Sequence, residues 1–136
     1  MKRTLMGEIS FAGFRHYLRA RSPEAEALFE EVERGEREAA LDAGIPVEEV
    51  DTGTYGIMSD VFWWGVFHPA LERGDVRLVR DCYAIIEEII RDGDRNLLEC
   101  LWIRVISYLE TSEWSSVSFE YGGPGLRGMF EEHATG

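Results

Sequence analysis

Lysine is nearly absent from this chain, and positive charge is scarce altogether. The 136 residues contain 26 Asp and Glu but only 14 Lys and Arg, which gives a formal net charge of −12, and Lys2 is the single lysine. Such a negative balance repels phosphate backbones and anionic lipid headgroups. We therefore expect neither nucleic acid nor a membrane among the partners of this protein.

Long apolar runs and cysteines are also few. No stretch reaches the roughly eighteen apolar residues that suggest a transmembrane helix, and the N-terminus lacks the apolar run of a signal peptide. Cys82 and Cys100 both fall in apolar helical segments, where buried, reduced thiols are the expectation, although antiparallel pairing of those segments would let the thiols approach. These features predict a cytoplasmic protein.

The usual signatures of catalysis are missing. The three histidines, His16, His68 and His133, lie in separate segments, and we expect none of them to build a metal site on its own helix. No glycine-rich phosphate loop precedes a lysine, and the serines near the C-terminus lack the glycines of a nucleophile elbow. We expect no metal, no cofactor and no enzymatic activity.

The residues that are present favour one helical domain spanning residues 1–136. Apolar residues make up 45% of the chain and aromatic residues 12%, which is enough for a hydrophobic core. Most of them recur at the three- and four-residue spacing of amphipathic helices. The sequence predicts an all-α protein, a compact bundle of about five to six helices with antiparallel helical hairpins and an irregular C-terminal segment.

Capping signals delimit the N-terminal helices. An apolar stripe marks the first helix and consists of Phe11, Phe14, Tyr17 and Leu18. It ends near Ser22, which together with Pro23 signals the start of a second helix, because serine can accept an orphan amide bond and proline suits the first helical position. Gly35 leaves open whether this helix ends there or continues to a cap at Gly44. Residues 45–56 predict an irregular connection that contains one helical turn.

Residues 57–71 are apolar on almost every side, which predicts a central, buried helix. Proline lacks an amide donor, so we expect either a kink at Pro69 or a new helix start with His68 as its cap. Asp60 is the only ionisable residue in the most apolar part of this segment. We expect Asp60 to lie on the one solvent-exposed side of this helix. Alternatively, Asp60 is a buried anchor or part of a site that binds a partner.

Two Gly-Asp joints, at residues 74–75 and 93–94, delimit the clearest feature of the chain. In each, the glycine closes one helix and the aspartate caps the next, which predicts an antiparallel helical hairpin from Asp75 to Glu110. Beyond it, apolar and polar residues alternate over residues 117–121, a strand-like pattern, and a last short helix is predicted at residues 126–133.

Acidic residues are concentrated between residues 23 and 51, where eleven carboxylates accompany two arginines. A charged helical run is usually a solvated face, but this density favours a docking surface for a basic protein. The candidate contacts are Glu30, Glu31, Glu33 and Glu36. We expect one or two of the four tryptophans to stay partly exposed, and Trp114, at the start of the irregular tail, is the candidate aromatic anchor.

Residues 57–130 resemble a known family. The segments that carry the resemblance are Leu71-Glu72-Arg73-Gly74-Asp75, Cys82-Tyr83-Ala84-Ile85-Ile86-Glu87-Glu88, Asp92-Gly93-Asp94, Leu97-Leu98 and Val105-Ile106-Ser107-Tyr108-Leu109-Glu110. Together they are similar to the core pattern of small helical immunity proteins of bacterial polymorphic-toxin systems. The resemblance implies a cytoplasmic protein that binds and neutralises a cognate toxin, and it fixes no catalytic residue.

The acidic surface suits a basic toxin domain such as a nuclease, whose phosphate-binding groove would accept carboxylates. Two other functions stay open at this stage. One is a helical adaptor for protein–protein interaction, although a single repeated joint falls short of the three repeats that stacked helical arrays need. The other is an enzyme that uses scattered carboxylates without a metal.

Overall fold

A computed structural model describes residues 8–50, 52–111 and 113–135. Within these residues every regular element is a helix, and the one β-type pairing is an isolated parallel bridge between Ile9 and Gly93. The predicted all-α class is therefore confirmed. None of the helices in this part of the chain combines the length and the apolar character that crossing a membrane requires.

The helices are α1 (Phe14–Arg21), α2 (Pro23–Ala43), α3 (Gly53–Gly56), α4 (His68–Arg73), α5 (Val76–Asp92), α6 (Arg95–Leu101), α7 (Ser107–Leu109), α8 (Ser115–Tyr121) and α9 (Pro124–Thr135). A 3₁₀ turn, η1, spans Val47–Glu49, and two π-helical segments are η2 (Ile57–Phe67) and η3 (Trp102–Ile106). Because η2 joins α3 to α4 and η3 joins α6 to α7 without a break, the described residues form seven helices and one 3₁₀ turn.

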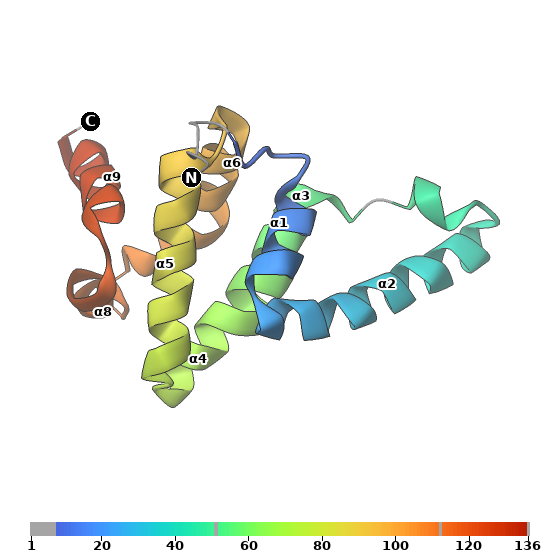
Figure 1. Ribbon diagram of the computed structural model, residues 1–136, viewed down its shortest axis with the longest axis horizontal. Coiled ribbons are helices and arrows are strands. Elements are labelled where there is room, and N and C mark those ends of the chain that lie inside the picture. The colour runs from blue at the N-terminus through green and yellow to red at the C-terminus, as the bar shows by residue number, and fades with distance from the viewer. Residues whose placement is uncertain (1–7, 51, 112, 136) are drawn as a thin grey trace, which may run out of the picture.

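The helices form a bundle from which one helix projects (Figure 1). The long α5 stands between α8 and α9 on one side and the α3–η2–α4 helix with α1 on the other. The outer half of α2 leaves the bundle and returns through η1. We call residues 37–50, the outer half of α2 together with η1, the arm.

The central helix was predicted correctly as the middle of the core. Seven of the eleven residues of η2 are buried, and the segment packs against α2, η3 and α5. Asp60 is exposed, so it lies on the wet side of this helix, as expected. The backbone stays helical through Phe67 and His68, and the His68 amide donates to the carbonyl of Trp63. Of the two alternatives expected at Pro69, the new start capped by His68 is therefore wrong, because π-helical bonding carries the chain up to Pro69.

Both Gly-Asp joints are confirmed. Asp75 and Asp94 cap α5 and α6 by accepting the amides three residues later, at 3.2 and 2.9 Å. Gly74 closes α4 in the left-handed region, with φ of 69°, whereas Gly93 is extended. Gly93 is needed for a different reason, since a Cβ there would lie 2.5 Å from the carbonyl oxygen of Ile89. The chain then runs back along α5, as the predicted hairpin requires (Figure 1).

The strand-like pattern of residues 117–121 was misleading, because this segment is α8. Its inner face follows helical spacing: Ser118 is buried, and Val117 and Tyr121 pack against the core. The Ser118 hydroxyl lies 2.9 Å from the hydroxyl of buried Tyr83 on α5. This tertiary hydrogen bond explains why a serine lies inside, which a search for alternating polarity cannot reveal.

The final helix was predicted over 126–133 and runs from Pro124 to Thr135. Its start is fixed by α5, because Glu87 accepts the amides of Gly125 and Leu126, both at 2.9 Å. A carboxylate at a helix N-terminus satisfies orphan amides and complements the helix dipole. The C-terminal segment is therefore fastened to the bundle as two helices, and it is more regular than predicted.

Candidate functional site

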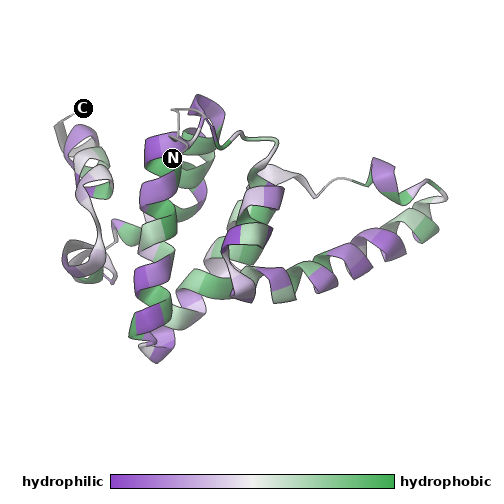
Figure 2. Cartoon of the chain, viewed as in Figure 1, coloured by the Kyte–Doolittle hydropathy of each residue, from purple (hydrophilic) through white to green (hydrophobic). Residues whose placement is uncertain are grey.

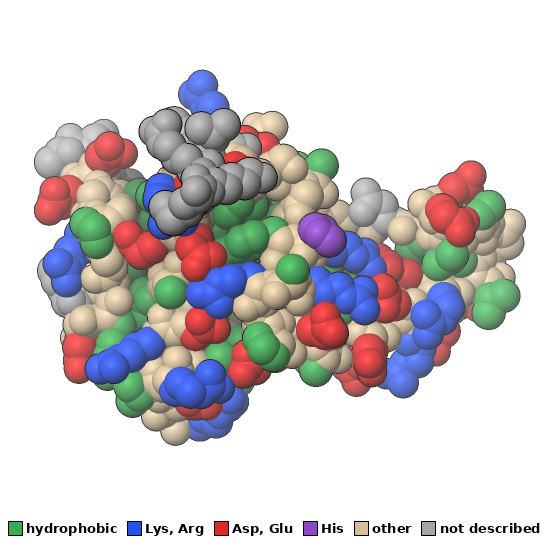
Figure 3. All heavy atoms as spheres, viewed as in Figure 1, with side chains coloured by type: hydrophobic (Ala, Val, Ile, Leu, Met, Phe, Trp, Pro, Cys, Tyr) green, Lys and Arg blue, Asp and Glu red, His purple; other side chains and the backbone are tan. Residues whose placement is uncertain are grey.

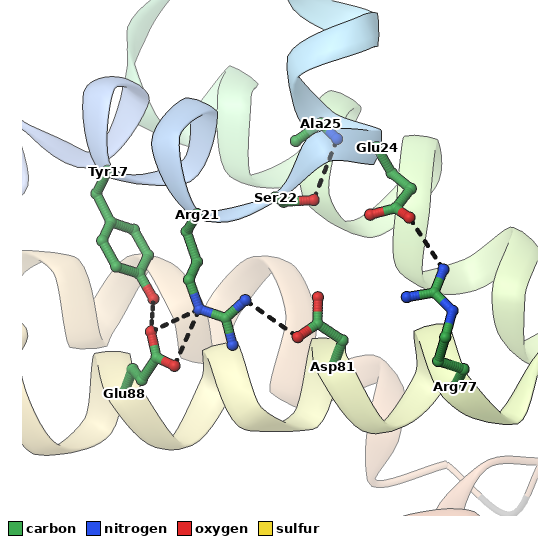
Figure 4. Close-up of polar contacts among 8 residues, drawn as sticks. All are labelled: Tyr17, Arg21, Ser22, Glu24, Ala25, Arg77, Asp81 and Glu88. Atoms are coloured by element: carbon green, nitrogen blue, oxygen red, sulfur yellow. Dashed lines mark hydrogen bonds and ion pairs between the residues drawn. The ribbon is translucent and has the colours of Figure 1, made fainter.

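Hydrogen bonds between α1 and α5 hold the start of α2 on the bundle (Figure 4). We call the residues that form them, Tyr17, Arg21, Asp81 and Glu88, the polar seam. The hydroxyl of Tyr17 donates to Glu88 at 2.5 Å, and the guanidinium of Arg21 donates to both oxygens of Glu88 and to Asp81 at 3.0 Å. Burial, reinforced by the bond to Glu88, raises the pKa of Tyr17. Charge-assisted bonds of this kind are stronger than neutral ones. The seam therefore fixes α1, and with it the start of α2, on the bundle.

The turn between α1 and α2 completes this attachment. The hydroxyl of Ser22 accepts the amide of Ala25 at 3.1 Å, so the predicted helix cap is confirmed. Next to it, Arg77 of α5 donates to Glu24 at 3.2 Å (Figure 4). Gly35 does not interrupt α2, which continues to a left-handed cap at Gly44. The arm thus projects from a helix whose first turns are fastened to the bundle.

Two of the four predicted acidic contacts are engaged within the protein. Glu36 is buried and accepts two hydrogen bonds from Arg15 at 2.8 Å and one from Thr52 at 2.6 Å. The Arg15 guanidinium, with help from Thr52, lowers the pKa of Glu36 to about 2. Glu33 accepts from Arg19 at 2.7 Å, and this bond lowers the pKa of Glu33. Glu36 is therefore not the surface contact that the sequence predicted, and Glu33 joins α2 to α1.

The other two predicted contacts lie on the surface. Glu30 and Glu31 are exposed and line a shallow hollow of about 340 Å³ together with Leu28 and Arg34. Arg34 lies 3.5 Å from Glu31, and both side chains of this pair are well solvated. Such pairs contribute little energy and open readily. Glu30 and Glu31 remain available to a partner.

The arm ends in an exposed apolar surface that the sequence analysis did not identify. Leu41 is 81% exposed, and Ile45 and Val47 are each 39% exposed. Hydropathy rises again at this outer end of α2, beyond a polar stretch (Figure 2), and apolar and acidic side chains lie next to one another there (Figure 3). We call Leu41, Ile45 and Val47 the arm tip.

Carboxylates surround the arm tip. All four carboxylates in the described part of the arm are exposed, and none forms an ion pair with another described residue; they are Glu38, Asp42, Glu48 and Glu49. Arg37 is the only basic residue of the arm. Phe29, Glu36 and Ala40 lie on the inner face of α2, and Leu41 lies off it. The arm tip is thus an apolar centre with an acidic rim.

Trp114 is partly exposed, as expected, although it is not the most exposed tryptophan of the described residues. It is half-buried, and its ring lies edge-on to His68, with centroids 5.9 Å apart. The most exposed tryptophan is Trp64, at 47%, on the same outward side of η2 as Asp60. Trp63 is buried and Trp102 is half-buried.

Trp114 and Trp64 belong to a small pocket of about 200 Å³. We call it the aromatic pocket, and its lining consists of Trp63, Trp64, His68, Tyr108, Thr111, Glu113 and Trp114. A larger hollow of about 640 Å³ lies beside the polar seam between α1 and α5. Its charged groups bind each other, as in the pair of Arg91 with buried Asp92 at 2.7 Å.

The remaining chemical groups are two thiols and scattered carboxylates. Cys82 and Cys100 are free and buried, as expected, and burial raises the pKa of both thiols, that of Cys100 to about 11. In the part of the chain that the structure describes, no three His, Cys, Asp or Glu side chains are placed to hold one metal ion. No protein-family model, curated protein or solved structure matches this chain.

Proposed function

We propose that this protein is a non-enzymatic inhibitor of the immunity class, which binds a basic toxin domain in the bacterial cytoplasm through its arm. The observation that carries the proposal is the arm tip: Leu41, Ile45 and Val47 are exposed at the end of a projecting helix, and the carboxylates around them pair with no other residue that the structure describes. Apolar side chains in the middle of a polar rim are the usual anatomy of a protein interface.

The negative charge of the arm indicates that the partner is basic. The arm holds four exposed carboxylates against Arg37, and the whole chain has a net charge of −12. A basic partner would be attracted over long distances and oriented toward the arm, with the effect mainly on the rate of association. Of the contacts predicted from the sequence, Glu30 and Glu31 stay in the proposed interface. Glu33 and Glu36 leave it, because they pair with Arg19 and Arg15.

The first test is genetic and biochemical. The protein would be co-expressed with the product of the gene next to its own, and growth and complex formation would both be measured. We expect growth to be rescued and a stable complex to form. Failure of both would overturn the proposal, whereas a stable complex with a partner that is not toxic would favour the helical adaptor.

The second test locates the interface. Leu41→Ser together with Ile45→Ser should weaken the complex by at least about tenfold, because both side chains would lose their apolar contacts with the partner. Val76→Ser is the matched control, since Val76 is 46% exposed at the far end of α5, away from the arm. Equal affinities of the arm variant and the control variant would place the interface elsewhere.

The acidic rim is tested through kinetics. Reversing Glu38, Asp42 and Glu48 to lysine should slow association at low salt and flatten its dependence on ionic strength. Reversal of Glu99 and Glu120, which are exposed outside the arm, changes the total charge without touching the rim. If both sets slow association equally per charge, the effect comes from net charge and not from the arm.

A further inference from the structure

The aromatic pocket lies apart from the arm, between the central helix and the segment that follows α7. Its walls come from two distant parts of the chain: Trp64 and His68 on one side, and Tyr108, Glu113 and Trp114 on the other. Trp64 and Tyr108 are both large, 47% and 40% exposed, and adjacent, with ring centroids 5.6 Å apart. Two exposed aromatic rings that border a cavity are available to a ligand.

Most of the ring pairs meet at steep angles, whereas Tyr108 stacks on buried Trp63 at 8°, with centroids 5.3 Å apart. The plane of Trp64 makes angles of 68° with Trp63, 67° with Tyr108 and 61° with His68. Trp114 is nearly perpendicular to His68, at 88°. Walls in several orientations surround a rounded group better than a flat one, which stacks on a single ring face.

The charges around the pocket favour a cation. Aromatic faces carry negative electrostatic potential and attract ammonium groups within about 6 Å. Glu113 adds a carboxylate to the lining, and Glu72 lies 3.6 Å from His68. Among the described lining residues there is no lysine or arginine to occupy the site from within.

We infer that the aromatic pocket binds an organic cation of the quaternary ammonium class, such as a trimethylammonium head group held by Trp64, Tyr108 and Trp114 beside Glu113. A quaternary ammonium donates no hydrogen bond, so it loses little when it leaves water for an aromatic enclosure. The volume of about 200 Å³ suits a compact head group and is below the range of sites that enclose a whole drug-sized ligand. This inference does not depend on toxin binding.

Tetramethylammonium chloride is the probe. It would be titrated into the full chain against sodium chloride at equal ionic strength, with tryptophan fluorescence and the indole N–H resonances as readouts. We expect saturable binding in the millimolar range, with shifts at Trp64 and Trp114 and none at Trp102. A response that rises linearly with salt, or that is the same for sodium, would overturn the inference.

Variants distinguish a loss of binding at the aromatic pocket from a general effect on the fold. Trp64→Ala should weaken binding by at least about tenfold, whereas Trp64→Phe keeps a ring face and should retain most of it. Trp102→Phe is the control, because Trp102 is a half-buried tryptophan that does not line the pocket. Guanidinium at equally low concentration should bind more weakly than tetramethylammonium, since it is flat, and equal or tighter binding of guanidinium would contradict the assignment.

The same cation could come from a free metabolite or from a protein side chain. Choline and a peptide that contains trimethyllysine would be compared, with unmethylated lysine peptide as the reference. Tighter binding of choline identifies a small-molecule site, and tighter binding of the peptide identifies a methylated protein. Preference for the unmethylated peptide over both would overturn the inference.

Discussion

At the scale of single residues, Glu36 shows how an apparently solvated acidic run acquires internal partners. Glu36 falls within a stretch of carboxylates that the sequence assigns to a helix surface. Its charge is nevertheless buried, and it is balanced by Arg15 of α1 and by Thr52 beyond the arm. Buried charges are tolerated when they are paired and hydrogen-bonded. Glu36 therefore ties both ends of the arm to α1.

Glu36→Gln should lower the free energy of unfolding at neutral pH by about 1 to 2 kcal/mol, because the bonds from Arg15 lose the charge of their acceptor. The folded state holds the pKa of Glu36 at about 2, below its ordinary value of 4.5. Its contribution is thus present above pH 4.5 and is lost as the pH falls toward 2. Urea unfolding at several pH values measures this, with exposed Glu38→Gln as the control. A difference between the two variants that persists unchanged at the lowest pH would contradict the assignment.

At the scale of elements, we predict opposite effects on stability when two glycines with different surroundings are replaced by alanine. Gly35 lies inside α2, and a Cβ there would meet nothing within 4 Å, so Gly35→Ala should stabilise the protein by up to about 1 kcal/mol. At Gly93 a Cβ would lie 2.5 Å from the backbone oxygen of Ile89, so Gly93→Ala should destabilise it markedly. Thermal unfolding of both variants checks this, and a neutral Gly93→Ala would mean that the α5–α6 joint is looser than the structure shows.

The helix starts predicted from the sequence agree with the structure where a capping residue is present. Ser22, Asp75 and Asp94 each mark a helix start that is visible in the sequence, because a capping bond joins residues only three apart. The segment 117–121 was mistaken for a strand, since five residues contain too little periodicity to separate the two patterns. What decides it is the contact of Ser118 with Tyr83, 35 residues away.

At the scale of the whole molecule, the candidate site depends on contacts between helices, which the periodicity of the sequence does not predict. The sequence located the acidic helix correctly but could not tell which carboxylates are free, because Arg15 and Arg19 reach Glu36 and Glu33 only after α1 folds back on α2. Leu41 likewise has an apolar side chain that the sequence alone would assign to a core. Its exposure follows from the projection of α2 beyond the bundle (Figure 1).

The two thiols provide a probe of whether α5 and α6 unfold together. Cys82 on α5 and Cys100 on α6 are both fully buried, and burial raises the pKa of each. Since the thiolate is the reactive form, neither should react with a thiol reagent at pH 8 until the core opens. We expect both to be labelled at one rate that follows global unfolding in urea, with Cys100→Ala and Cys82→Ala as single-thiol references. Rapid labelling of Cys100 alone in the native protein would show that α6 opens independently of α5.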